Sequence, residues 1–212
     1  MNNKFFRFWW KVGNIVLINI LWILCCIPVI TVGASCAAMY RAIFDLREGK
    51  AGCIKNFFCG FKKCFGLATK VWLCLAAAAG VVYLIPQVVS VLQMQIVSLV
   101  TAGALFAVMI ILWLLMVCVF PLVAYFDTNL KKTLRNAAFI AIKHRKKSVG
   151  SALIAAIPLA LLMFVPEIFL WTSGIWALIF PGAVAYLIAK RFTPILESYN
   201  NKRKEKEQEV QS

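Results

Sequence analysis

Two long stretches of the chain, residues 71–130 and 148–189, contain no lysine or arginine, and this constrains the fold more than any other feature. Hydrophobic residues make up 63% of the 212 positions, whereas a soluble domain contains about 45–50%. A soluble chain needs polar side chains to cover its surface, and this chain has too few of them. We therefore expect an all-α, polytopic membrane helical bundle that forms one membrane domain over residues 1–200.

Several apolar segments are long enough, or nearly so, to cross a hydrocarbon core of about 30 Å, which takes about 18 residues or more. The first is longer than the apolar core of a signal peptide and contains Trp22 and Pro28, so we expect a retained span. We predict about five transmembrane helices in total. They are expected at Val12–Val32, Ala68–Val91, Ile96–Phe126, Val149–Val165 and Ile175–Ala189.

The 23 lysines and arginines alternate with these segments, and only 8 acidic residues balance them. The connections 33–70, 127–148 and 190–212 are long and basic, whereas the turns near 92–95 and 167–174 contain no lysine or arginine. Because positively charged loops stay in the cytoplasm, we expect the basic connections and the C-terminus to be cytoplasmic. The positive charge is thereby explained by the membrane, and no nucleic-acid partner is expected.

Three further basic residues, Lys4, Arg7 and Lys11, precede the first apolar segment and leave two topologies open. Five spans place the N-terminus outside, with its aromatic and basic side chains in the headgroup region. In the alternative, residues 15–46 form a re-entrant hairpin bent at Pro28, which places the N-terminus inside. Each arm would then be about half a span, and other helices would have to cover the irregular backbone.

Two basic segments, 54–70 and 128–147, have the spacing of amphipathic helices, and we expect two cytoplasmic interfacial helices there. Thr128 or Asn129 is suited to cap the second helix. On an anionic inner leaflet each cation contributes about 1 kcal/mol; docking of a cytosolic partner is the alternative. The contact residues would be Phe57, Phe58, Phe61, Lys62, Lys63, Lys131, Lys132 and Arg135. The polar tail at 201–212 is expected to be disordered.

The chain offers little for catalysis or metal binding. Acid–base chemistry needs positioned carboxylates or histidines, but the only acidic residues beside the spans are Asp127 and Glu167, and His144 lies in a lysine run. The 8 cysteines do not have the spacing of a zinc site. We therefore expect no catalytic, cofactor or metal site. The lack of ionisable residues within the spans also argues against an ion-coupled carrier.

The segment "NILWILCCIPVITVGASCAAMY" at 19–40 resembles the opening of the YesL-like family of bacterial membrane proteins, domain of unknown function 624. Two later segments, at 57–65 and 119–141, resemble further parts of that family in the expected order. Together they extend the resemblance over most of residues 1–200. The matching positions of the first segment have no known role and are Asn19, Trp22, Pro28, Thr31, Gly33, Ala37, Ala38 and Tyr40.

The resemblance implies a bacterial plasma-membrane protein with an accessory role in sugar uptake, because family members are often encoded near carbohydrate importers and polysaccharide-degrading enzymes. We therefore expect a non-enzymatic accessory or assembly partner of an ABC-type carbohydrate transport system, with importer subunits and the bilayer as its partners. A permease for a neutral solute such as an oligosaccharide is the alternative. A membrane-embedded enzyme is disfavoured because acid–base residues are missing.

Overall fold

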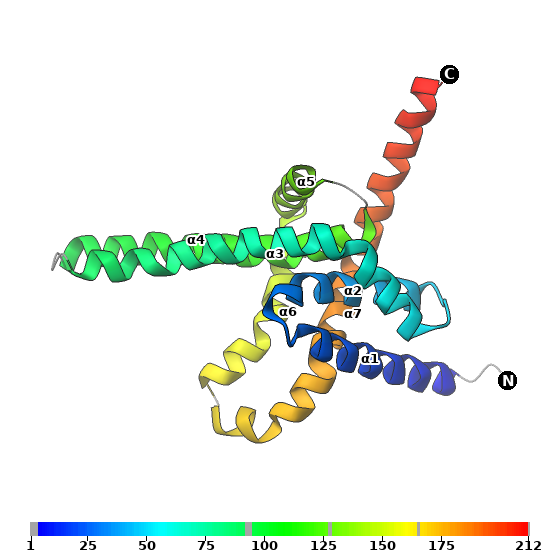
Figure 1. Ribbon diagram of the computed structural model, residues 1–212, viewed down its shortest axis with the longest axis horizontal. Helices are drawn as coiled ribbons and strands as arrows, with labels where there is room; N and C mark the ends of the chain where they lie inside the picture. Colours follow the sequence, from blue (N-terminus) through cyan, green and yellow to red (C-terminus); the bar gives the residue numbers. More distant parts are fainter. Residues whose placement is uncertain (1–3, 92–94, 127–128, 165, 212) are drawn as a thin grey trace.

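The computed structural model describes residues 4–91, 95–126, 129–164 and 166–211, and all regular elements in these ranges are helical. The predicted all-α fold is confirmed, and five segments are long and apolar enough to cross a membrane. The elements, drawn in Figure 1, are α1 (Lys4–Cys26), η1 (Val29–Thr31), α2 (Val32–Arg47), α3 (Cys53–Val91), α4 (Gln95–Tyr125), α5 (Leu130–Lys143), α6 (Arg145–Phe164) and α7 (Pro166–Gln211).

The five apolar segments are not quite the five that the sequence predicts. The predicted Ile96–Phe126 matches α4 almost residue for residue. The predicted fourth span corresponds to α6, whose second half lies partly outside the described side chains that the five segments were drawn from, so it stays a prediction. A segment around α2, which the sequence did not predict as a separate span, is among the five. The segments long and apolar enough to cross a membrane are Phe8–Cys26, Val29–Arg47, Cys53–Ile85, Leu99–Tyr125 and Leu178–Asn201.

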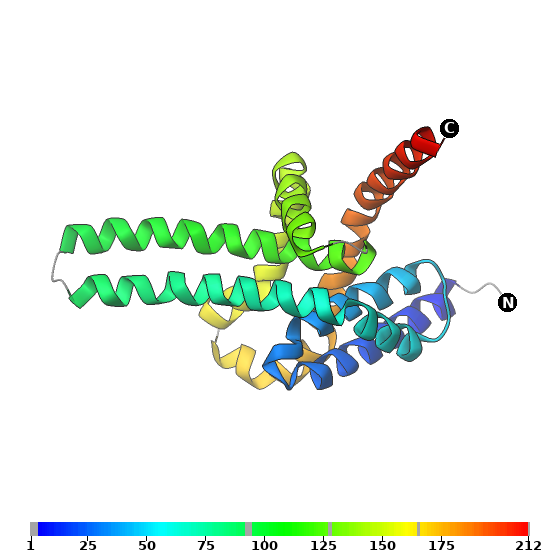
Figure 2. The ribbon, with the colours of Figure 1, turned by 45° about the horizontal axis from the view of Figure 1, so that its top comes forward.

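The predicted first span, Val12–Val32, is not one helix, and that prediction is wrong. α1 ends at Cys26, Pro28 adopts an extended conformation with φ −76° and ψ 117°, and α2 begins at Val32. Proline cannot continue the backbone hydrogen bonding of a helix, so the chain reverses and α2 returns beside α1 (Figure 2). The reversal at Pro28 agrees with the bend of the alternative topology, but the arms of 23 and 16 residues are longer than the half-spans expected, and each lies in a segment long and apolar enough to cross a membrane. Whether the hairpin is re-entrant stays a prediction.

α2 is the central helix, because it packs against α1, α3, α4 and α7. Its first half consists of small residues, and Ala34, Ala37 and Ala38 are fully buried. A Cβ atom added to Gly33 would lie 2.5 Å from both the carbonyl oxygen of Ala68 and the Cβ of Trp72. Small residues let membrane helices approach closely, and here glycine permits α2 to touch the backbone of α3.

Two helical hairpins extend from this centre and diverge from each other (Figure 1). In one, α3 and α4 pack together; at about 1.5 Å of rise per residue the 39 residues of α3 span about 58 Å. In the other, α6 packs against α7. Within the described ranges α3 contacts neither α6 nor α7, so the far part of the α3–α4 hairpin is covered by no other helix of the chain.

Two further expectations differ from the structure. Residues 54–70 do not form a separate interfacial helix, because α3 runs without interruption from Cys53 to Val91. The tail at 201–211, expected to be disordered, continues α7 as a helix, and its Lys, Glu, Gln and Arg residues have high intrinsic helix propensity. The second expected interfacial helix is confirmed as a separate element, α5, and Asn129 occupies its N-cap position.

Gly33 provides a direct test of this packing. We expect Gly33→Ala to lower the free energy of unfolding by about 1–3 kcal/mol, because the added methyl group overpacks a backbone contact. Gly66→Ala in α3 is the matched control, since a Cβ there meets nothing within 4 Å and alanine favours the helix by about 0.5–1 kcal/mol. Denaturant titration of both variants in detergent micelles measures the difference. Equal stability of the two variants would contradict the close α2–α3 contact.

Candidate functional site

The turn between α1 and α2 is held by two side chains that donate hydrogen bonds to backbone carbonyls at this turn. The hydroxyl of Thr31 donates to the carbonyl oxygens of Cys25 at 2.6 Å and Pro28 at 2.7 Å. The indole Nε1 of Trp72, on α3, donates to the carbonyl of Val29 at 2.9 Å. The exposed side chains of the turn are apolar, namely Ile27, Val29 and Ile30. Because irregular backbone in hydrocarbon must find partners within the protein, this tip is suited to apolar surroundings.

Asn19 and Trp22 connect α1 to its neighbours. Asn19 is fully buried, and its Nδ2 donates to the carbonyl oxygen of Leu178 on α7 at 2.6 Å. Gly182 lies against it, since a Cβ at that glycine would come within 2.9 Å of the Asn19 Oδ1. Trp22 Nε1 donates to the Cys36 Sγ on α2 at 3.4 Å. Polar side chains join membrane helices in this way.

The remaining positions of the resemblance also have packing roles. Ala38 is fully buried, and Tyr40 is buried in the core beside the small residues of α2. The sequence identifies the positions in 19–40 that carry the family resemblance, but it does not reveal the contacts that their side chains form. In the structure Asn19, Trp22, Thr31 and Gly33 each fasten the hairpin formed by α1 and α2 to itself or to another helix.

Two arginines near the end of α2 form contacts that the sequence analysis missed, because it counted them as loop charges. Arg41 Nη1 donates to the carbonyl oxygen of Ala124 at the end of α4 at 3.1 Å. Arg47 Nη1 donates to the Thr193 hydroxyl on α7, and its guanidinium carbon lies 5.9 Å from the centroid of the Tyr186 ring. The uninterrupted helix-forming run through both arginines is the signal that they lie on a helix.

The residues predicted to contact a leaflet or a partner are divided between surface and core. Phe57 is fully buried in the core and is not available for an outer contact, and Phe61 is half-buried against the core. Of the three phenylalanines that we expected at the outer surface of α3, only Phe58 is exposed. The exposed members of the predicted set are Phe58, Lys62, Lys63, Lys131, Lys132 and Arg135.

α5 presents a basic and apolar outer face. Phe139 is 52% exposed and Ile142 is 77% exposed, and they share this face with the exposed Lys132 and Arg135. The inner face is held by Thr133, Ala137 and Ile140, which are buried. Exposed apolar and cationic side chains on one helix face are typical of helices that lie at a bilayer surface.

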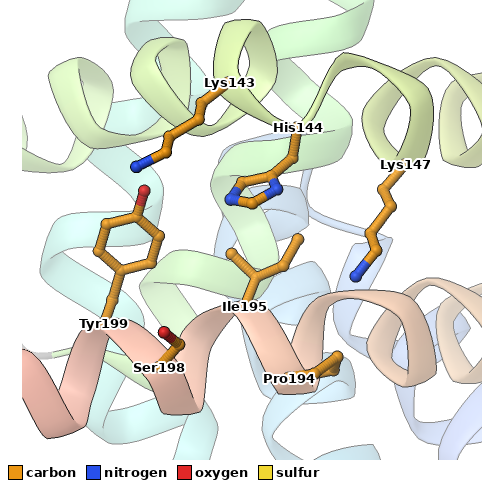
Figure 3. A pocket seen from close by; sticks show the side chains of 7 residues that line it. All are labelled: Lys143, His144, Lys147, Pro194, Ile195, Ser198 and Tyr199. Carbon is orange, nitrogen blue, oxygen red and sulfur yellow. The ribbon is translucent and has the colours of Figure 1, made fainter.

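A pocket of about 240 Å³ lies where the corner between α5 and α6 meets α7. Figure 3 shows three basic side chains entering from the corner and four side chains entering from α7. The lining residues are Lys143, His144, Lys147, Pro194, Ile195, Ser198 and Tyr199. None of them is acidic, and in the described part of the chain no carboxylate lies within ion-pair distance of Lys143 or Lys147.

Aromatic rings form one wall of the pocket. The Tyr199 ring contacts Phe139 edge-to-face at 6.4 Å and His144 edge-to-face at 6.5 Å between ring centroids. The Lys143 ammonium lies 5.8 Å from the centroid of the Tyr199 ring, and Figure 3 places it beside the tyrosine hydroxyl. The Tyr199 hydroxyl oxygen is buried and has no hydrogen-bond partner in the structure.

The imidazole of His144 is kept uncharged by its surroundings. Burial, followed by the positive charges of Lys147 and Lys143, lowers the pKa of His144 below its usual value of 6.5. His144 also closes α5 and opens α6, since its backbone NH donates to Ile140 and its carbonyl accepts from the NH groups of Lys147 and Ser148. The pocket is therefore cationic through its lysines and lies at the positive N-terminal end of α6.

Residues 15–84 match the family described as "Protein of unknown function, DUF624". The match confirms the resemblance for this region and contains two of the three segments that carry it, 19–40 and 57–65, whereas 119–141 lies outside it. No curated protein and no solved structure matches the chain. The matched region holds the hairpin formed by α1 and α2 and most of α3; the pocket lies outside it.

His144 makes the charge of the pocket measurable, because it is the only histidine in the chain. We expect its imidazole NMR signal to titrate below pH 6.5, since burial and both lysines disfavour the imidazolium. Lys147→Met removes one repulsive charge and should raise the pKa of His144, whereas Lys131→Met on the outer part of α5 should leave it unchanged. An unperturbed pKa in the wild type would contradict this arrangement.

The same shift has a consequence for stability. Above pH 6.5 the imidazole is neutral in both the folded and the unfolded chain, so it adds no pH dependence. As the pH falls below 6.5, the unfolded chain takes up the proton first, and the free energy of unfolding decreases until the folded chain also becomes protonated. A His144→Gln variant should lose this part of the pH dependence.

Proposed function

We propose that this chain, which carries a DUF624 region at residues 15–84, is a non-enzymatic accessory or assembly subunit of a membrane transport system. The divergence of the two hairpins is the observation that supports this role best. The far part of the α3–α4 hairpin leaves large apolar side chains uncovered; Tyr83 is 67% exposed, Leu99 is 77% exposed and Phe106 is 69% exposed. An arm of this kind suits lateral packing against another membrane subunit.

That the subunit is non-enzymatic is part of this proposal and follows from the few acidic residues and the single histidine of the sequence. The polar contacts of the hairpin formed by α1 and α2, such as those of Asn19 and Trp22, connect helix to helix. These contacts serve assembly of the bundle, which is what an accessory subunit requires of its core.

The system is proposed to be a carbohydrate importer of the ABC type in a bacterial plasma membrane. This part of the proposal is supported by the resemblance alone, since members of the family are often encoded near carbohydrate importers. The importer's membrane subunits are the proposed partners, and the α3–α4 hairpin is the proposed contact surface.

We further propose that the N-terminus is cytoplasmic. The start of α1 lies at the same end of the molecule as the α2–α3 connection and the C-terminal part of α7, whereas α3 and α6 end on the opposite side (Figure 1). With α6 as a further span beside the five apolar segments the number of crossings is even, so the basic N-terminal segment falls on the same side as the C-terminus, in agreement with the charge rule for cytoplasmic loops.

Protease protection measures the side of the N-terminus. A cleavable tag fused before residue 1 should remain intact when protease is added to intact cells and should be cleaved after the membrane is opened. The same tag placed after Ser212 serves as the control, because it should behave identically. Cleavage of the N-terminal tag in intact cells, with the C-terminal tag protected, would contradict the cytoplasmic assignment.

Site-specific photo-crosslinking tests the partner surface. A photoreactive phenylalanine at Phe106 should crosslink to a membrane subunit of a carbohydrate importer in cells grown on polysaccharide, because this ring points away from the bundle. Phe120 on the same helix is the matched control: it is only 4% exposed and should give crosslinks only within the chain. Mass spectrometry identifies the partner.

The outcomes separate the proposal from its competitors. Lipid adducts alone at Phe106, or a changing set of unrelated proteins, would count against an accessory subunit. Uptake of labelled oligosaccharide by liposomes that contain only the pure protein would instead favour a permease for a neutral solute.

A further inference from the structure

The pocket between the α5–α6 corner and α7 has a chemistry that the proposed function does not use. Two lysines enter it from one corner, no acidic residue lines it, and neither lysine forms an ion pair with a described carboxylate. Both lysine side chains are exposed, and because no acidic residue lines the pocket they give it a net positive charge. This charge attracts a negatively charged group.

The donors that face this space indicate which kind of anion fits. Lys143 and Lys147 supply compact positive charges, the form in which lysine binds phosphate. Ser198 and Tyr199 supply hydroxyl groups, and the hydroxyl oxygen of Tyr199 has no hydrogen-bond partner in the structure. A phosphate group has several acceptor oxygens and can engage donors from both sides of the pocket, whereas a single carboxylate has only two.

Exposed apolar side chains flank the corner that lines this pocket. After the corner, α6 exposes apolar side chains one turn apart: Val149 is 45% exposed, Leu153 is 66% exposed and Ile157 is 41% exposed. Before the corner, Ile142 of α5 is 77% exposed. Exposed apolar surface next to cationic side chains suits contact with a lipid, whose acyl chains are apolar and whose headgroup carries the phosphate.

The size of the pocket agrees with a headgroup and not with a larger ligand. Sites for drug-sized molecules enclose about 300–1,000 Å³, and this pocket encloses about 240 Å³. We propose that it binds the phosphate group of an anionic phospholipid, with Lys143 and Lys147 contacting the phosphate and Tyr199 donating its hydroxyl to a phosphate oxygen. The site joins three elements, α5, α6 and α7, so a bound lipid stabilises their arrangement. This inference does not depend on the identity of any transport partner.

The test uses the full chain in nanodiscs of phosphatidylcholine, with phosphatidylglycerol added in steps. Native mass spectrometry counts bound phosphatidylglycerol, and the NMR signal of His144 reports occupancy of the pocket, because a nearby anion raises the pKa of the imidazole. We expect saturable binding in the wild type. Lys143→Met with Lys147→Met should weaken it about 25-fold, from a roughly fivefold contribution of each lysine.

Matched variants distinguish specific binding of the lipid in the pocket from non-specific electrostatic attraction to the basic surface. Lys55→Met with Lys70→Met removes the same charge from exposed positions of α3 outside the pocket and should change binding less than about twofold. Tyr199→Phe removes one hydroxyl, keeps the ring and serves if the double lysine variant does not fold; it should weaken binding about threefold to tenfold. Circular dichroism verifies that each variant is folded.

Three results would contradict the proposed lipid site. Equal loss of binding in both double-lysine variants, or unchanged binding by a folded Tyr199→Phe variant, would overturn the site. Inorganic phosphate added to discs of phosphatidylcholine distinguishes the source of the phosphate group. Saturation of the His144 signal by millimolar phosphate, without competition from phosphatidylglycerol, would overturn the assignment to a lipid.

Discussion

The close contact between α2 and α3 at Gly33 is the constraint on which the rest of the structure depends. α2 has 16 residues, and only because its first half is small can four other helices surround it. The contact also brings Trp72 within reach of the turn before α2, where it satisfies the carbonyl of Val29. The close approach of α2 to α3 therefore does two things: it packs the helices, and it lets Trp72 bond a backbone carbonyl of the turn.

The reversal at Pro28 determines where the two ends of the N-terminal hairpin lie. Because the chain turns back there and does not pass straight through, the start of α1 and the end of α2 lie at the same side of the bundle. The proposed cytoplasmic side of the N-terminus rests on this geometry. A count that treats the stretch from 12 to 32 as one span leads to the opposite expectation.

The sequence predicted the helices best where a single physical property decides the outcome. The bounds of α4 follow from its uninterrupted apolar composition. The reversal at Pro28 was only the alternative to a straight first span, because proline can either kink a membrane helix or end it. Burial on α3 was not predictable in this way: Phe57 is in the core while Phe58 is exposed, and only the position of α2 decides between them. The pocket likewise depends on α7 bringing Tyr199 to His144, which no local pattern encodes.

The contacts of Arg41 and Arg47 also bear on how the protein is made. Both arginines lie on the second helix of the chain, but their partners, Ala124 and Thr193, lie much later in the sequence. A chain emerging from the ribosome therefore lacks the acceptor of Arg41 until α4 is made and the acceptor of Arg47 until α7 is made. The N-terminal hairpin reaches its final environment only when synthesis is almost complete, so a chain shortened before residue 193 leaves the Arg47 guanidinium without its hydrogen bond to Thr193.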